Sequence, residues 1–162
     1  MKSLLLLRHA QALAIVAGTN DKTRALSDHG VAQARTVGTG LRQAGWKAER
    51  ILSSSALRAQ QTAETARAAA GWKTSVTVRE QLYNADAMTM IDLLRADGAG
   101  VECLLLVAHA PGIPALASAL TTHRGDLSVL CEPATLIEVL LDIDSWADIA
   151  PGCASLRRVL PS

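Results

Sequence analysis

Aromatic side chains are nearly absent from this chain of 162 residues. It contains no Phe, one Tyr and three Trp. Hydrophobic residues nevertheless make up 49% of the total, which excludes disorder as the state of the whole chain. The core must therefore be built from Leu, Val, Ile and Ala. The length suits one domain, and we expect residues 1–162 to fold as a single unit.

An excess of charge of one sign is also missing. The 16 Lys and Arg residues are balanced by 15 Asp and Glu residues, and the net charge is +1. Scattered basic residues give no electrostatic footprint for a nucleic acid or a membrane surface, so we expect neither as a partner. The three cysteines, Cys103, Cys131 and Cys153, lack metal-type spacing. We expect reduced thiols, no disulfide framework and no metal site.

Long hydrophobic runs are absent as well. No uninterrupted apolar run approaches the ~20 residues of a membrane span. The apolar residues 4–7 and 12–17 could suggest a signal peptide, but Arg8 and His9 interrupt them at the centre, where such a segment tolerates charge poorly. We therefore expect a cytoplasmic protein.

Short apolar strands recur along the chain. Strands are predicted at residues 4–7, 50–53, 76–78 and 103–107, and two more, 136–141 and 155–160, close the chain. Segments with helical spacing separate most of them. Because strands and helices alternate, we expect an α/β fold. It would be a three-layer sandwich with a mostly parallel central sheet, helices on both faces and a C-terminal antiparallel edge.

Four helices are predicted from apolar spacing and end signals. Ser27 and Ser55 are suitable N-caps for the first two. The third is marked by Met88, Ile91 and Leu94. Pro111 is well placed in the first turn of the fourth.

Two of the buried strands end in a histidine. Arg8-His9 follows the first strand, and His109 follows the strand 103–107. Ligands of open α/β sheets bind outside the carboxyl ends of the strands, so both rings can face one pocket. Arg58, at the start of the second helix, enters the same region, and Arg24 is a further candidate. Taken singly, each of these residues could be a surface or packing residue; the combination is more specific.

Such a pocket suits a phosphoryl group. Forked arginine donors match its oxygens, and helix N-termini add backbone donors. A neutral imidazole can attack phosphorus and form a covalent intermediate, while a second, protonated imidazole stabilises the equatorial oxygens. The remaining histidines, His29 and His123, lie in polar segments and are expected to be solvated.

Several segments then resemble one family. Residues 7–12, Leu-Arg-His-Ala-Gln-Ala, resemble the Arg-His-Gly signature of the histidine phosphatase superfamily, also called phosphoglycerate mutase-like. Residues 24–34, 51–63 and 105–112 are similar to its later blocks, in the family's order. The resemblance spans most of residues 1 to 120. It departs from the pattern at Ala10, Ala108, Ala110 and Ser55, none of which removes a catalytic side chain.

The resemblance implies a role for each site residue. His9 would be the phosphorylated nucleophile, and Arg8, Arg58 and His109 would complete the phosphate pocket. Arg24 matches a position that can add a phosphate contact. Many members also use a carboxyl group as general acid. Glu80 is the nearest candidate and Asp86 a distant second, although Glu80 could equally be a solvated carboxylate at a strand end.

The short chain leaves no room for the inserted lid subdomain of larger members, and it resembles the SixA-type phosphohistidine phosphatases. Imidazole leaves phosphorus more readily than an alkoxide, so a strong protein acid is less necessary. We expect a metal-independent phosphatase without cofactor that acts on a phosphorylated protein. The alternatives are a phosphomonoesterase for a small phosphorylated substrate and a non-catalytic phosphate-binding module.

Overall fold

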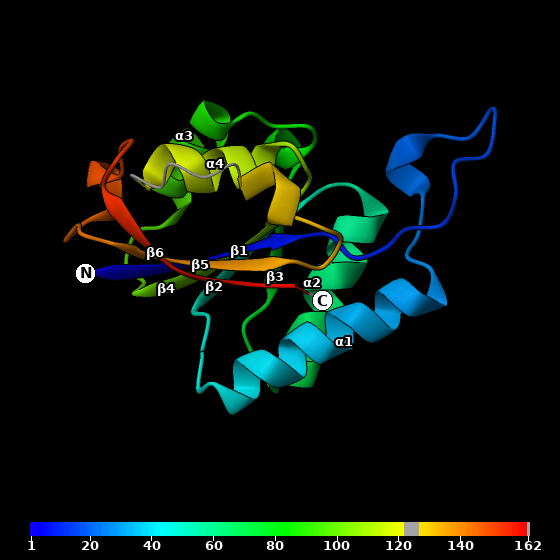
Figure 1. The fold of residues 1–162 in the computed structure, drawn as a ribbon, viewed down its shortest axis with the longest axis horizontal. Coiled ribbons are helices and arrows are strands. Elements are labelled where there is room, and N and C mark those ends of the chain that lie inside the picture. Colours follow the sequence, from blue (N-terminus) through cyan, green and yellow to red (C-terminus); the bar gives the residue numbers. More distant parts are fainter. Residues whose placement is uncertain (122–126, 162) are drawn as a thin grey trace.

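A six-stranded sheet forms the centre of the molecule, in the order β3-β2-β4-β1-β5-β6 (Figure 1). The computed structural model describes residues 1–121 and 127–161. The strands are β1 (Lys2–Arg8), β2 (Arg50–Ser54), β3 (Val76–Arg79), β4 (Cys103–Ala108), β5 (Leu136–Leu141) and β6 (Ala154–Leu160). Strands β1 to β4 are mutually parallel, whereas β5 is antiparallel to β1 and to β6. The predicted α/β fold with an antiparallel C-terminal pair is confirmed.

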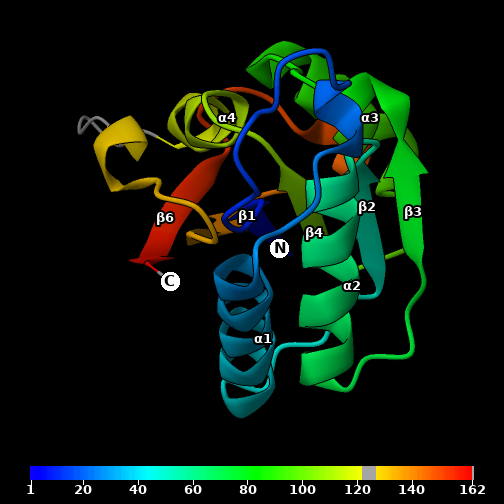
Figure 2. The same ribbon diagram turned by 90° about the vertical axis from the view of Figure 1, so that its right-hand side faces the viewer.

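Two helices cover each face of the sheet. Helices α1 (Asp28–Gln43) and α2 (Leu57–Ala70) lie side by side on one face (Figure 2). Helices α3 (Ala87–Asp97) and α4 (Gly112–Leu120) lie on the other, above the sheet in Figure 1. Short 3₁₀ helices follow β1 (η1, Asp21–Thr23) and β3 (η2, Glu80–Leu82), precede β5 (η3, Leu127–Leu130) and precede β6 (η4, Trp146–Asp148). The predicted three-layer arrangement is confirmed.

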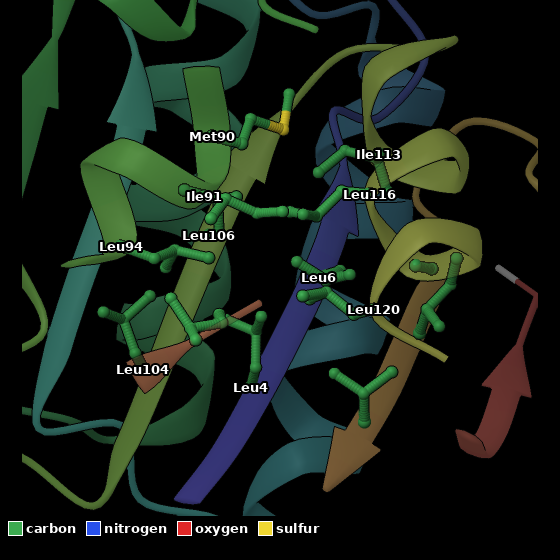
Figure 3. Packing of buried hydrophobic residues seen from close by; sticks show 14 of the residues in the cluster. Leu4, Leu6, Met90, Ile91, Leu94, Leu104, Leu106, Ile113, Leu116 and Leu120 are labelled. Carbon is green, nitrogen blue, oxygen red and sulfur yellow. The ribbon is translucent and has the colours of Figure 1, made fainter. Parts of the chain in front are cut away.

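Aliphatic side chains build both halves of the core. Successive residues of a strand point to opposite faces, so Leu4 and Leu6 pack toward α3 and α4 (Figure 3), while Leu5 and Leu7 pack toward α1 and α2. Small residues let α1 and α2 approach closely. A Cβ at Gly38 of α1 would lie 2.2 Å from the Ala66 carbonyl oxygen of α2.

Helix starts agree with the sequence in one case and differ in two. Ser27 is the N-cap of α1 and accepts the Gly30 N–H. Ser55 is not a cap, because α2 begins two residues later, after Ala56, whose side chain has no polar atom. Helix α3 begins after Asp86, and this phase turns Met88 to solvent.

Ile91 and Leu94 of α3 are buried as predicted, and Met90 is buried in place of Met88. Cys103 and Cys131 are buried, Cys153 is partly buried, and all three are free. Within residues 1–121 and 127–161, no helix is long and apolar enough to cross a membrane.

Candidate active site

The strand order brings the two predicted histidines together. Strand β4 lies between β1 and β2, with Ala108 beside Arg8 of β1. The backbone N–H of His9 donates to the Ala108 carbonyl, at 2.9 Å. The rings of His9 and His109 meet edge to face, with their centroids 5.1 Å apart. Both side chains therefore border one site at the carboxyl edge of the sheet.

Helix α2 adds Arg58 from its first turn. The Arg58 side chain is buried, and its Nε lies 3.3 Å from Nε2 of His9. Thr62, one turn later, ties α2 to the segment after β1: its hydroxyl accepts the Ala10 N–H, at 3.0 Å, and donates to the Arg58 carbonyl, at 2.7 Å. The α2 residues that follow β2 thus fix Arg58 against His9.

Close packing of α1 holds the same segment. A Cβ on Gly30, in the first turn of α1, would lie 2.0 Å from the carbonyl oxygen of Gln11. Only glycine leaves room for this backbone crossing. The N-terminus of α1 therefore sits directly beneath the residues that follow His9.

His9 has one unprotonated imidazole nitrogen, Nε2, which accepts the hydrogen bond from Arg58 Nε. Its Nδ1 lies 2.8 Å from the Ala10 carbonyl oxygen, which assigns the proton to Nδ1. Nε2 then carries the lone pair that faces Arg58. Burial lowers the pKa of His9 to about 4, the Ala10 hydrogen bond opposes this, and the charges of Arg58 and Arg8 add to the lowering. His9 is therefore neutral at pH 7, the form in which an imidazole is a nucleophile.

His109 is more deeply buried than His9. Its Nε2 lies 2.7 Å from Oγ of Ser54, and its Nδ1 has no hydrogen-bond partner among the described residues. Burial lowers the pKa of His109 to about 3, and repulsion from His9 at the low pH where that ring is protonated, and from Arg58, adds to the lowering. The second imidazole is thus neutral in the free protein, and the expectation of a protonated ring is not met there. A bound dianion would raise this pKa.

The Arg8 guanidinium has a buried donor atom without a partner. Its Nη1 donates to the Cys131 carbonyl, at 2.6 Å, while its buried Nε has no partner among the described residues. A buried donor without a partner costs about 1–3 kcal/mol. Nδ1 of His109 is another buried polar atom of this site without a partner among the described residues. Two unsatisfied polar groups around a neutral nucleophile are the features expected where an anion binds.

Asp21 of η1 is a member of the site that the sequence did not reveal. Its Oδ2 accepts from Arg58 Nη2, at 2.9 Å, and from the Tyr83 hydroxyl, at 2.7 Å. Its Oδ1 accepts from Nε and Nη2 of Arg24, and its backbone carbonyl from Arg58 Nη1. The hydrogen bond from Tyr83, followed by those from Arg58 and Arg24, lowers the pKa of Asp21 to about 2.

These contacts change the expected role of the arginines. Both terminal nitrogens of Arg58 are held by Asp21, so the forked contact expected between Arg58 and a phosphoryl group is not free. The Nε edge is the part that faces His9. Arg24 does reach the site, although its guanidinium contacts Asp21 and the Leu13 carbonyl.

Glu80 lies at the outer edge of the site. Its exposed carboxylate forms an ion pair with Lys22, which lowers the pKa of Glu80. The Lys22 ammonium lies 4.8 Å from the ring centroid of Tyr83, and that ring is 5.6 Å from the ring of His109. A carboxyl group that stays ionised is a poor proton donor.

The remaining candidates have simpler explanations. Asp86 is the N-cap of α3 and accepts the Thr89 N–H. His29 is exposed on α1, and His123 lies outside the described residues. No group of three or more His, Cys, Asp or Glu side chains is placed to hold a metal ion within the described part of the chain. A cavity of about 280 Å³ opens beside His109, between residues 84–87 and the start of α4.

Two site residues were missed for an identifiable reason. Asp21 lies in an irregular polar loop, where no repeating pattern in the sequence predicts the direction of a side chain. Tyr83 is the single tyrosine of a chain without Phe, and that rarity was the one available signal.

Comparison with known proteins agrees with this geometry. Residues 4–98 match the family model of the histidine phosphatase superfamily, branch 1. An uncharacterized protein of Mycobacterium tuberculosis is 34% identical over 156 residues, which cover 93% of this chain and 96% of that protein.

Solved structures extend the comparison to the fold. A candidate SixA phosphohistidine phosphatase from Nakamurella multipartitia superposes with a TM-score of 0.82 at 28% identity, over 99% of this chain and 95% of that one. The protein histidine phosphatase SixA in complex with tungstate has the same fold, with a TM-score of 0.82 at 22% identity, over 98% and 96% of the two chains. The chain belongs to the histidine phosphatase superfamily, and its fold is that of the SixA-type members.

Proposed function

We propose that this protein removes the phosphoryl group from a phosphohistidine of another protein, through a phosphohistidine formed on its own His9. The observation that carries the proposal is the neutral His9 ring, whose unprotonated Nε2 lies against Arg58 Nε, at a site where buried polar atoms of Arg8 and His109 have no partner among the described residues. The similarity to SixA-type structures supports the choice of substrate.

Two displacements at phosphorus complete the reaction. In the first, Nε2 of His9 forms a bond to phosphorus while the bond to the substrate imidazole breaks, and that imidazole leaves with a proton from water. In the second, water attacks phosphorus, the bond to Nε2 of His9 breaks and inorganic phosphate leaves, while the attacking water releases to solvent the proton that balances the one taken up in the first step. The donors of Arg8, Arg58 and His109 stabilise the charge on the phosphoryl oxygens in both steps. No step uses a metal ion.

The loop after β1 favours a protein as the substrate. Leu13, Ile15 and Val16 are 52%, 72% and 62% exposed on this loop, which we call the apolar rim. The rim begins beside the site, because the Leu13 carbonyl accepts a hydrogen bond from Arg24, which also contacts Asp21. Exposed apolar clusters commonly mark interaction sites. A small phosphorylated molecule would leave the rim uncovered, whereas a phosphoprotein surface can bury it.

The central experiment is a substrate panel combined with trapping. A phosphohistidine protein should be hydrolysed faster than sugar phosphates, with an activated aryl phosphate as reference. His9→Ala should lower turnover about 10³-fold or more. Brief quenching of the wild type should trap an acid-labile phosphoryl group on His9. His29→Ala, which removes an exposed histidine of α1, is the matched control.

Each competing function has a distinct outcome. Full activity of His9→Ala would refute the assignment of His9 as the nucleophile. Binding of phosphate without turnover of any substrate would indicate a phosphate-binding module. Preference for a sugar phosphate would indicate a small-molecule phosphomonoesterase.

The apolar rim has its own test. The double variant Ile15→Ser, Val16→Ser should raise KM for the phosphoprotein about fivefold or more, since it removes apolar area from the interface. It should leave aryl phosphate hydrolysis unchanged. Val78→Ser on β3, also an exposed apolar residue, is the control. An equal change for both substrates would show that the rim does not contact the protein substrate.

A further inference from the structure

Asp21 places a negative charge where a phosphoryl dianion is expected to bind. Its carboxylate accepts from Arg58 Nη2, at 2.9 Å, and from Arg24 Nη2, at 3.1 Å. A carboxylate beside a bound dianion is repulsive. An acidic residue at this point must therefore contribute something that offsets the repulsion.

The contribution lies in the orientation of Arg58. Free guanidinium groups rotate about several bonds, but Asp21 holds both terminal nitrogens of this one, through its carbonyl at 2.8 Å and its Oδ2. The remaining donor, Nε, then points at Nε2 of His9. We propose that Asp21 is a positioning residue for phosphoryl transfer, which fixes the Nε edge of Arg58 beside the nucleophile and offsets part of the positive charge of the site.

The charges around Asp21 support the second half of this proposal, which rests on the proposed function. Arg8, Arg24 and Arg58 supply three positive charges and Asp21 one negative charge. Lys22 and Glu80 pair with each other, and both histidines are neutral. The net charge of about two matches a phosphoryl dianion. Without Asp21 the site would bind phosphate more tightly and release the product more slowly.

Tyr83 fixes the orientation of the Asp21 carboxylate. Its hydroxyl donates to the Oδ2 atom that also accepts from Arg58. Its ring packs edge to face against His109. Asp21 thereby links the loop after β1 to η2 and to α2, three segments that border the site.

Asp21→Asn is the decisive variant, because it keeps the shape and removes the charge. We expect kcat to fall about 10- to 100-fold, since small misplacement of a catalytic group has effects of that size. We expect the affinity for inorganic phosphate, measured by calorimetry, to rise about tenfold. Tyr83→Phe keeps the carboxylate and should lower kcat less, with phosphate affinity unchanged.

Glu64→Gln is the matched control, since Glu64 and Arg67 form an exposed ion pair with the same three-residue spacing as Asp21 and Arg24. It should change neither quantity. A rise in kcat of Asp21→Asn would show that Asp21 obstructs the site, and unchanged kcat would reduce its role to folding. If the wild type binds phosphate but hydrolyses no phosphohistidine, the proposed function fails. Whether or not the proposed function holds, phosphate binding by Asp21→Asn that is unchanged or weaker would overturn the role of Asp21 in offsetting the positive charge of the site.

Discussion

Replacing Arg58 by Lys tests the geometry of the site while its charge is kept. The Arg58 side chain is only 4% exposed, and its three nitrogens contact His9 Nε2, at 3.3 Å, and two oxygen atoms of Asp21, at 2.8 and 2.9 Å. A lysine has one nitrogen and can occupy only one of these places. If that nitrogen pairs with Asp21, the contact beside His9 is lost.

The size of the effect follows from the one hydrogen bond that Arg58 Nε can donate to a phosphoryl oxygen once the lone pair of His9 Nε2 has bonded to phosphorus. A hydrogen bond to a charged group contributes about 1.5–3 kcal/mol. Loss of about 2–3 kcal/mol in the transition state lowers the rate about 30- to 150-fold, because 1.36 kcal/mol corresponds to a factor of ten. We therefore expect kcat/KM of Arg58→Lys to fall by that factor, for phosphohistidine protein and aryl phosphate alike.

The assay needs a control on the same helix. Arg67 of α2 contacts Glu64 and the Trp72 carbonyl, away from the site. Arg67→Lys should keep the wild-type kcat/KM. Circular dichroism must show that both variants are folded. The reasoning is refuted if folded Arg58→Lys stays within about threefold of the wild type, or if Arg67→Lys is impaired equally.

Four further predictions concern the pH dependence of activity, the pH dependence of stability, Glu80 and metal ions. The pKa of His9 is about 4, so kcat/KM, corrected for titration of the substrate, should fall only below about pH 4–5. A fall in kcat/KM that begins near pH 6.5 would contradict the burial of His9. His9 and His109 bind protons more readily when unfolded, with a pKa near 6.5, so stability to urea should decrease as the pH falls from about 6.5 to 4. Glu80→Gln should barely change phosphohistidine turnover, and alkyl phosphates should be poor substrates throughout; efficient sugar phosphate hydrolysis that collapses in this variant would overturn the substrate assignment. EDTA should leave the rate unchanged, and activity that is lost and then returns with added Mg²⁺ or Zn²⁺ would reveal a metal site.

The pattern of apolar residues in short segments was sufficient to predict the strands and the position of both histidines. The apolar run that ends at Arg8-His9 and the run that ends at His109 specify two buried strands, and strand direction then places both rings at one edge. These inferences succeed because a strand's periodicity and its endpoint are properties of a few adjacent residues. The same locality explains why Ser27 was a correct cap. The two errors concern single residues near helix starts: Ser55 precedes the N-cap of α2, and Met88 in the first turn of α3 is exposed.

Tertiary structure alone decided how the site is completed. Insertion of β4 between β1 and β2 sets the 5.1 Å separation of the His9 and His109 rings. Asp21 meets Arg58 across 37 positions of sequence and Tyr83 across 62. No periodicity orients a side chain in an irregular loop. The engagement of Arg58 by Asp21 depends on where that loop lies against α2 and η2, and only the folded chain determines that position.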